Sequence, residues 1–277
     1  MRCMMLMKSD AKTETAGFAD EAELTAMGKF NEEMMNAGVM LAGEGLYPTA
    51  KGARVRVADG KTSVDNGPFA ESKELVAGFW LIQTRSREEA LEWLRRVPAG
   101  DGRVELRPLY EMEDFPVDPK EQPAGWRDQE EKTREEWEAR PPARKPGTKR
   151  FILLLKSDSK TEAGAPPVQE VLEAMGALMQ ESVVAGSMLG GEGLKPSSLG
   201  ARLRVVGGKR STVDGPFAET KELIAGYVLM QLGSLGEAVE FALRWLEIHL
   251  RVGVSEGEIE IREVMEADDL RVGSARA

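Results

Sequence analysis

An internal repeat constrains this chain more than any other feature of its sequence. Residues 8–83 align with residues 156–231 without a gap, at a constant offset of 148, and 40 of the aligned positions are identical. Composition alone does not produce that level of identity. Self-similarity on this scale predicts two structural units of the same fold. We therefore expect two copies of one domain, residues 1–115 and 150–277, joined by residues 116–149.

The joining segment differs in composition from both copies. Residues 116–150 hold six of the 14 prolines of the chain, and residues 128–140 are densely charged with both signs. Such a segment cannot bury enough apolar surface to become ordered by itself. Two interpretations remain open: a linker whose Trp126 and Trp137 pack on a neighbouring domain, or a docking helix that carries the same two tryptophans.

Both copies give the same order of secondary-structure elements. A short apolar run predicts a first strand, and apolar residues at helical spacing predict a helix after it. Gly38 and Gly186 mark the expected ends of that helix. A strand, a hairpin with an alternating pattern, a strand that is apolar on both faces, a second helix and a final strand follow. The predicted order is βαββαβ with an added hairpin, which is a ferredoxin-like pattern.

This pattern predicts an α+β fold and a specific way of packing the two copies. Two helices cover only one face of a four-stranded antiparallel sheet, yet the strand sequences are apolar on both faces. The other face needs a cover, and the sibling copy can provide it. We expect two ferredoxin-like domains packed sheet to sheet as an intramolecular pseudo-dimer that resembles a dimeric α/β barrel. Further pairing with a second chain is left open.

Composition excludes several functional classes. The chain has 47 acidic and 37 basic residues and a formal net charge of −10, with no strongly basic cluster, so nucleic acid is not an expected partner. Its longest apolar runs are far shorter than the ~20 residues of a membrane-spanning helix. A single cysteine, Cys3, and an N-terminus without the features of a signal peptide favour the cytoplasm.

The sequence also gives no sign of a cofactor or a metal. His249 is the one histidine, and neither histidines nor carboxylates are clustered as metal ligands. The glycine-rich segment 190–193 is not followed by the helix that a dinucleotide-binding loop requires.

Several separated blocks, present in order in both copies, resemble a known family. They are Gly191-Glu192-Gly193-Leu194, Asp214-Gly215-Pro216-Phe217-Ala218-Glu219, Ala225-Gly226-Tyr227 and Glu260-Ile261-Arg262, with counterparts in the first copy. These blocks are similar to the YCII-related family, in particular to its Asp-Gly-Pro-Phe (DGPF) branch. The resemblance implies a ferredoxin-like fold of the dimeric α/β-barrel type and a bacterial origin, and it implies little about chemistry.

Within the motif, an aspartate is the first candidate for catalysis. Asp214 takes the aspartate position in the second copy, whereas the first copy has Asn66 there and Asp65 one residue earlier. Asparagine cannot act as a general base, so only the second copy would use this group in proton transfer. The other interpretation is a turn former, because aspartate and asparagine both accept a nearby backbone N–H. Asp65 is retained as a candidate ligand-binding residue.

A glutamate lies between two glycines in both copies. Glu44 and Glu192 stand at the expected end of a strand, where a carboxylate can face a cavity and act as an acid or a base if burial raises its pKa. We assign Glu192 as a candidate catalytic residue and Glu44 as a candidate ligand-binding residue. A solvated loop glutamate is the alternative.

Two arginines recur on one face of a strand in each copy. They are Arg54 and Arg56 in the first copy and Arg202 and Arg204 in the second. One of each pair can bind a carboxylate ligand by two hydrogen bonds. Pairing with glutamates of the same sheet is the alternative.

Two functions follow as hypotheses from different classes. The first is binding, with or without turnover, of a small polar or anionic metabolite in a cleft near the Asp-Gly-Pro-Phe turn of the second copy. The second is a non-enzymatic accessory or regulatory protein linked to extracytoplasmic-function sigma factors, which the family resemblance suggests. The fold alone does not separate them.

Overall fold

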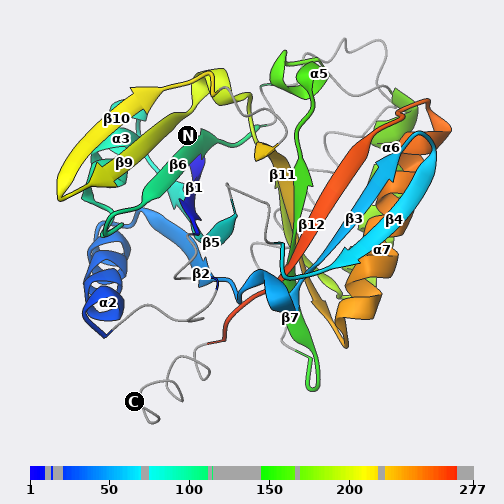
Figure 1. Cartoon of the computed structure of the whole chain (residues 1–277), viewed down its shortest axis with the longest axis horizontal. Coiled ribbons are helices and arrows are strands. Elements are labelled where there is room, and N and C mark those ends of the chain that lie inside the picture. The colour runs from blue at the N-terminus through cyan, green and yellow to red at the C-terminus, as the bar shows by residue number, and fades with distance from the viewer. Residues whose placement is uncertain are drawn as a thin grey trace.

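A computed structural model describes residues 1–9, 14, 21–69, 75–111, 114, 145–165, 169–217 and 222–266. Within these residues the chain forms two six-stranded antiparallel sheets flanked by helices, as Figure 1 shows. The α+β fold class expected from the sequence is therefore confirmed. Trp126 and Trp137 lie outside the described residues, so the two interpretations of their segment both stay predictions.

The two copies contain matching elements in the predicted order. Copy 1 consists of β1 (Arg2–Lys8), α2 (Glu21–Asn36), β2 (Met40–Gly45), η1 (Thr49–Lys51), β3 (Ala53–Ala58), β4 (Lys61–Asn66), β5 (Val76–Gln83), α3 (Arg87–Arg96) and β6 (Arg103–Pro108). Copy 2 consists of β7 (Lys149–Lys156), α5 (Ser159–Glu162), α6 (Gln169–Val184), β8 (Met188–Gly193), η3 (Ser197–Leu199), β9 (Ala201–Val206), β10 (Lys209–Asp214), β11 (Ile224–Leu232), α7 (Leu235–Arg251) and β12 (Gly257–Glu263).

Local sequence signals explain where the helices begin and end. Gly38 and Gly186 follow α2 and α6 with φ of 67° and 63°, a left-handed conformation that glycine adopts without steric cost. At the start of α3, Ser86 accepts a hydrogen bond from the backbone N–H of Glu89, and Ser234 does the same for Glu237 at the start of α7. These signals act within a few residues, so the sequence alone predicts them.

Each sheet is completed by a hairpin from the other copy. The strand orders are β10-β9-β6-β1-β5-β2 and β4-β3-β12-β7-β11-β8. In Figure 1 the yellow β9–β10 hairpin of copy 2 lies beside β6 of copy 1, and the cyan β3–β4 hairpin of copy 1 lies beside the orange-red β12. The sequence predicted both hairpins as additions to their own copy. The structure shows instead that they are exchanged.

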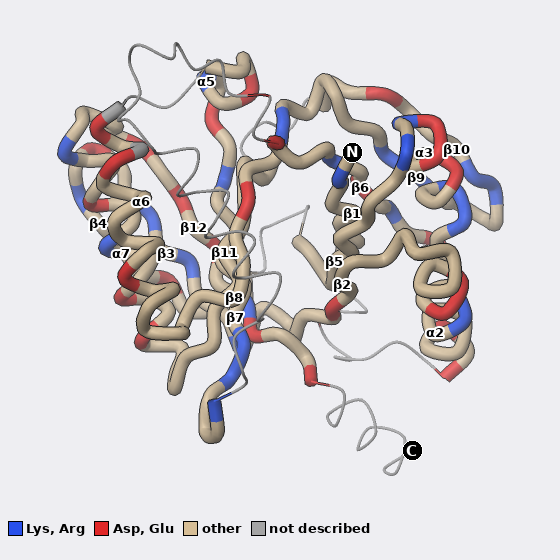
Figure 2. The backbone as a smooth tube through the Cα atoms, turned by 180° about the vertical axis from the view of Figure 1, so that it is seen from behind, with Lys and Arg blue, Asp and Glu red and all other residues tan. Residues whose placement is uncertain are grey.

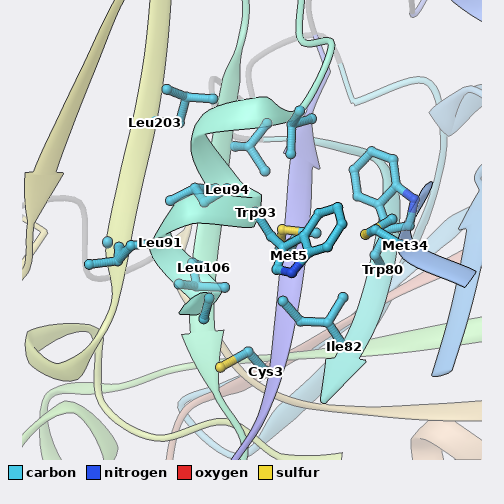
Figure 3. Packing of buried hydrophobic residues seen from close by; sticks show 14 of the residues in the cluster. Cys3, Met5, Met34, Trp80, Ile82, Leu91, Trp93, Leu94, Leu106 and Leu203 are labelled. Atoms are coloured by element: carbon cyan, nitrogen blue, oxygen red, sulfur yellow. The ribbon is translucent and has the colours of Figure 1, made fainter. Parts of the chain in front are cut away.

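The exchange extends into the core between sheet and helices. On the helix side of the first sheet, Leu203 of the exchanged hairpin belongs to the same buried cluster as Leu91, Leu94 and Leu106 of copy 1 (Figure 3). The second sheet buries Val55 of copy 1 in the equivalent way. Each exchanged hairpin therefore contributes backbone hydrogen bonds and apolar contacts to the other copy.

A third apolar cluster joins the two sheets. Its buried members come from both copies: Met4, Leu6, Leu46, Val76, Phe79, Leu109, Ile152, Leu154, Leu194, Ile224, Tyr227 and Val264. Both faces of β5 are apolar because each is buried: Phe79 lies in this cluster, and its neighbour Trp80 lies in the helix-side core. The predicted sheet-to-sheet pseudo-dimer is thus confirmed.

The glycine of each Gly-Pro-Phe turn lies against a 3₁₀ turn of the same copy. A Cβ added at Gly215 would lie 1.9 Å from the carbonyl oxygen of Ser197, and one added at Gly67 would lie 1.7 Å from that of Thr49. Only glycine permits so close an approach of two backbone segments. The turn and the η3 segment therefore form one packed unit.

This close approach predicts a position-specific effect on stability. Gly215→Ala should lower the free energy of unfolding by about 2–3 kcal/mol, because the added methyl group forces backbone apart. Gly176→Ala is the matched control: this residue lies inside α6 with open space around it, so alanine should stabilise by about 0.5–1 kcal/mol. Urea unfolding of both variants measures the difference. Equal effects at the two positions would contradict the close packing.

The exchange also predicts how an isolated copy behaves. A protein of residues 150–277 has its β9–β10 hairpin without β6 and half of the inter-sheet cluster exposed to water. It should form a homodimer in which two molecules exchange hairpins. Light scattering on a size-exclusion column measures the mass, and a stable, folded monomer would contradict the prediction.

Candidate functional site

A buried carboxylate lies at the centre of a polar cluster beside the motif turn of copy 2. Glu105 on β6 is 1% exposed. Its Oε2 accepts a hydrogen bond from Arg202 Nη2 at 2.9 Å, and its Oε1 accepts one from Arg107 Nη1 at 3.0 Å. Lys8 Nζ, at the end of β1, lies 3.5 Å from Oε2. Three cations thus surround one carboxylate in the interior.

The same cluster crosses between the copies through Arg107, which is fully buried. Arg107 Nη2 donates to the carbonyl oxygen of Lys195 at 2.6 Å and to Glu162 Oε1 at 3.3 Å. The other oxygen of Glu162 accepts the backbone N–H of Ser197 at 2.9 Å. We name the set Lys8, Glu105, Arg107, Glu162 and Arg202 the Glu105 cluster.

The motif turn contacts this cluster through its phenylalanine. The Arg202 guanidinium carbon lies 4.1 Å from the centre of the Phe217 ring, a cation–π arrangement. Phe217 is itself buried, and its backbone N–H donates to Ser197 Oγ at 3.3 Å. One physical role of the Gly-Pro-Phe sequence is therefore to hold an aromatic ring over Arg202.

A second cluster repeats this arrangement with the copies interchanged. Its members are Lys156, Glu260, Arg262, Glu14 and Arg54, which we name the Glu260 cluster. Arg54 Nη2 donates to Glu260 Oε2 at 2.8 Å, Arg262 Nη1 donates to Glu260 Oε1 at 3.1 Å, and Phe69 takes the place of Phe217. Both clusters therefore need residues from both copies.

The cations hold the two central carboxylates in their ionised form. Burial by itself would raise the pKa of Glu105, but the charges of Lys8, Arg107 and Arg202 outweigh burial and lower this pKa to about 2. In the same way, Lys156, Arg262 and Arg54 lower the pKa of Glu260 well below its usual range despite burial. Neither glutamate can serve as a proton donor near neutral pH.

The sheet faces that carry the two clusters differ in the residues beside them. We call the face with Glu105 the first face and the face with Glu260 the second face. On the first sheet, Arg103 lies directly opposite Arg204, two residues along the strands from the pair of Glu105 and Arg202. On the second sheet the matching position is Glu258, whose Oε2 accepts a hydrogen bond from Arg56 Nη2 at 2.6 Å. The register of both pairs is the same, so only the residue type changes.

A second matched position changes charge in the same direction. Val213 on β10 lies opposite Arg202, whereas Asp65 on β4 lies opposite Arg54. The compared positions are Lys8, Arg103, Glu105, Arg107, Glu162, Arg202, Arg204 and Val213 on the first face and their counterparts on the second. Over these matched positions the first face carries a charge of +3 and the second is neutral. Figure 2 shows basic positions along the β9–β10 hairpin.

The structure separates Asp214 from the other predicted site residues. Asp214 lies opposite Ala201, whose side chain is in the helix-side core, and its Oδ1 accepts a hydrogen bond from Arg87 Nη2 at 2.5 Å. Arg202, the next residue along β9, points to the other face of the sheet, where Glu105 lies. A single cleft lined by Asp214 and Arg202 is therefore not formed, because side chains alternate along a strand. A catalytic role of Asp214 stays a prediction.

Glu44 and Glu192 lie in ion pairs between the copies. Glu192 Oε1 accepts a hydrogen bond from Arg2 Nη1 at 2.7 Å, and Glu44 Oε2 accepts one from Arg150 Nη2 at 2.9 Å. Arg2 is at the opposite end of β1 from Lys8, so Glu192 is remote from the Glu105 cluster. A role of either glutamate in acid–base chemistry stays a prediction.

The structure does bring the predicted arginines and Asp65 to the two cluster faces. Arg202 and Arg54 each bind a glutamate of the same sheet, which is the alternative that the sequence left open. Arg56 pairs with Glu258, and Asp65 stands opposite Arg54. Arg204 is exposed beside Arg103 on the first face.

The sequence interpretation missed the centres of both clusters. Glu105, Arg107, Lys8 and Glu162 were not assigned any role, although each has an identical counterpart in the other copy. For Glu105, Arg107 and Lys8, the available signal was a charged residue retained in both copies on a strand that otherwise reads as buried; Glu162 lies in α5 and shows only the retention. Their convergence depends on the hairpin exchange, which the sequence does not reveal.

Two further searches of the described residues bear on the class of site. No group of three or more His, Cys, Asp or Glu side chains in that part of the chain is arranged to hold a metal ion. Among the helices that the structure describes, none is long and apolar enough to cross a membrane.

The fold and the two composite clusters define a tandem protein in which one chain supplies both halves of a dimeric α/β-barrel-like unit. The model of the YCII-related domain matches residues 1–113 and 150–268, and the chain belongs to this family. An uncharacterised protein of Rhizobium meliloti (strain 1021) is 36% identical over 93 residues, which cover 32% of this chain and 75% of that protein. That relative is thus about the size of one copy.

A solved structure shows a more distant likeness. A mutant chlorite dismutase from Candidatus Nitrospira defluvii is 11% identical, and the alignment covers 99% of this chain and 94% of that chain with a TM-score of 0.40. No conclusion about function follows from so distant a likeness.

The buried charges predict an acid-sensitive stability. Because the pKa of Glu105 is lower in the folded protein than its ordinary value of 4.5, its contribution is complete above about pH 4.5 and is lost as pH falls toward 2. Glu105→Gln should cost about 3–5 kcal/mol at neutral pH, since two buried cations and the half-buried Arg202 lose their counter-charge. The variant should also show a weaker pH dependence of unfolding in that acidic window.

Urea unfolding at several pH values measures both effects. Glu181→Gln is the control, because Glu181 forms an exposed pair with Arg244 and its loss should change stability little. If the two variants behaved alike, the cluster would not be a buried ionic network.

Proposed function

We propose that this protein binds a small anionic metabolite on the face of the first sheet that carries Arg103, Arg202 and Arg204. We name these three residues the arginine triplet. The site lies beside the Asp-Gly-Pro-Phe turn of copy 2, whose Phe217 covers Arg202. The observation that carries the proposal is the charge of +3 summed over the eight matched positions of this face, compared with zero over their counterparts on the other face.

The chemistry of the triplet supports an anion as ligand. Guanidinium groups present several N–H donors in a plane and bind carboxylates or phosphates by pairs of hydrogen bonds. Like charges directly opposite each other on neighbouring strands are destabilising. Arg103 lies directly opposite Arg204 on the neighbouring strand, so a small anion near this pair is attracted by two positive charges.

The surroundings of the triplet also favour binding. Arg202 is half-buried and held by Glu105 and Phe217, so less side-chain freedom is lost when a ligand binds. Arg204 is exposed and open to solvent, which allows a ligand to enter. In a protein with a net charge of −10, a local positive face also raises the local concentration of small anions.

The proposed function is binding, and turnover would need an additional group. The carboxylate of Glu105 is ionised and neutralised by cations, and Asp214 projects from the other face of the hairpin. We therefore assign the triplet to ligand binding and assign no acid or base to this site.

A pair of matched variants tests the proposal. Arg204→Ala should weaken binding of small anions by at least about tenfold, the loss of one charge-assisted hydrogen-bonding group. Arg56→Ala is its counterpart on the other face, where Glu258 already neutralises the arginine, and it should leave binding unchanged. Calorimetric titration with succinate, phosphate and sulfate as probes measures the affinities, at two salt concentrations to show screening.

Two results would contradict the proposal. One is the absence of measurable binding of every probe to the wild-type protein. The other is equal weakening by the Arg204 and Arg56 variants, which would indicate a general effect of surface charge.

A further inference from the structure

We infer that a pocket between α2, the end of α3 and the start of β10 binds a phosphate monoester whose ester group is apolar. The pocket is separate from the arginine triplet. Arg210 of β10 lies opposite Val205, whose side chain is in the helix-side core, whereas Arg204, the neighbour of Val205, points to the other face. The two sites are therefore on opposite faces of the hairpin, and either can exist without the other.

The pocket is positively charged and has the size of a small-molecule site. Its volume is about 510 Å³. Four cations and one carboxylate line it: Lys29, Glu33, Arg95, Arg96 and Arg210. These five side chains carry a net charge of +3, in a protein whose net charge is −10. Figure 1 shows where the pocket lies, between α2 and the tip of the β9–β10 hairpin.

Two of these cations, Lys29 and Arg95, have no side-chain partner among the described residues. Both are exposed. Arg96 is paired with Glu33, and its guanidinium carbon also lies 4.1 Å from the centre of the Trp93 ring. An anion that enters the pocket can therefore bind the donors of Lys29 and Arg95 without breaking a contact within the described part of the protein.

The end of α3 already carries a positive charge, although the C-terminal end of a helix is normally its negative end. Pro98 ends the helix, because the residue before a proline avoids the helical conformation, and Val97 has ψ of 128°. Arg210 Nη1 donates to the carbonyl oxygens of Arg95 at 2.7 Å and of Val97 at 2.8 Å. Two carbonyls of the helix end are thus satisfied by a cation before any ligand binds.

The other copy shows which of these charges the fold needs. The ion pair of Glu33 and Arg96 recurs in copy 2 as the pair of Glu181 and Arg244. Each of the other three cations is replaced there by an uncharged residue: Ala177, Leu243 and Thr62 stand for Lys29, Arg95 and Arg210. The fold therefore forms without these three charges, and a ligand explains why they gather around one pocket.

The charge and the wall of the pocket indicate the class of ligand. A phosphate monoester carries nearly two negative charges near neutral pH and has three strong acceptor oxygens, so it matches several cations better than a carboxylate does. Phe30 and Pro98 also line the pocket, so part of its wall is apolar. An apolar ester group can lie against them while the phosphate binds Lys29 and Arg95.

Titration of the full-length chain with phenyl phosphate tests this inference. NMR of the arginine side-chain Nε–H groups should show shifts at Arg95 and Arg210. Binding should weaken as pH falls below about 6, where the phosphate group takes up a proton and loses one negative charge. Inorganic phosphate lacks the ring and benzoate carries a single charge, so each should bind at least about fivefold more weakly.

Two exposed residues provide the variants. Lys29→Ala and Arg95→Ala should each weaken phenyl phosphate binding by about fivefold, because each removes one charge-assisted contact at an exposed site. Arg85→Ala is the matched control, since it removes the same charge from an exposed arginine before the start of α3, and it should leave binding unchanged. Circular dichroism and the urea midpoint check folding, and Arg95→Gln replaces Arg95→Ala if that variant does not fold.

Three results would contradict the inference. Absence of shifts at Arg95 and Arg210 would overturn the pocket as a binding site, whatever is found at the arginine triplet. Equal weakening by the Arg95 and Arg85 variants would indicate a general effect of charge and would also overturn the site. Binding of benzoate or inorganic phosphate as tightly as phenyl phosphate would overturn the ligand class. The proposed function is tested separately through Arg204→Ala, so its failure and the failure of this pocket are distinguishable.

Discussion

The exchange of hairpins between the two copies is the constraint on which the rest of the structure depends. A strand such as β6 or β12 has hydrogen-bonding groups on both edges, and on one edge they are satisfied by β9 or β3 of the other copy. The same hairpins supply Leu203 and Val55 to the cores under the helices. Neither half is a complete structural unit, because the apolar inter-sheet cluster and the two hairpin contacts need residues of both copies.

The buried charges are a consequence of this exchange. Glu105 and Glu260 are almost fully enclosed, and an isolated ionised carboxylate in such a place is strongly unfavourable. Each is neutralised by two arginines and a lysine. One of these arginines, Arg202 for Glu105 and Arg54 for Glu260, lies on the exchanged hairpin. Buried ion pairs that need both partners favour one arrangement over others. Here they favour exchanged hairpins paired in a defined register.

Duplication within one chain allows the two equivalent faces to diverge. In a symmetric homodimer any substitution appears on both faces, whereas here Arg103 and Glu258, or Val213 and Asp65, differ at matched positions. The buried centres have remained the same while the rim has changed charge. The proposed anion site on the first face uses this freedom, because the rim of that face carries Arg103 where the second face carries Glu258.

The sequence by itself determined the repeat, the strands and helices, the turns at Gly38 and Gly186, and the sheet-to-sheet packing of the copies. These properties depend on local periodicity, on backbone freedom and on counting the apolar faces that need a cover. Only the tertiary structure decided which copy completes each sheet, because a hairpin presents the same hydrogen-bonding edge to either partner. For that reason it alone could bring Lys8, Glu105 and Arg202 together, and place Asp214 on the opposite face from Arg202.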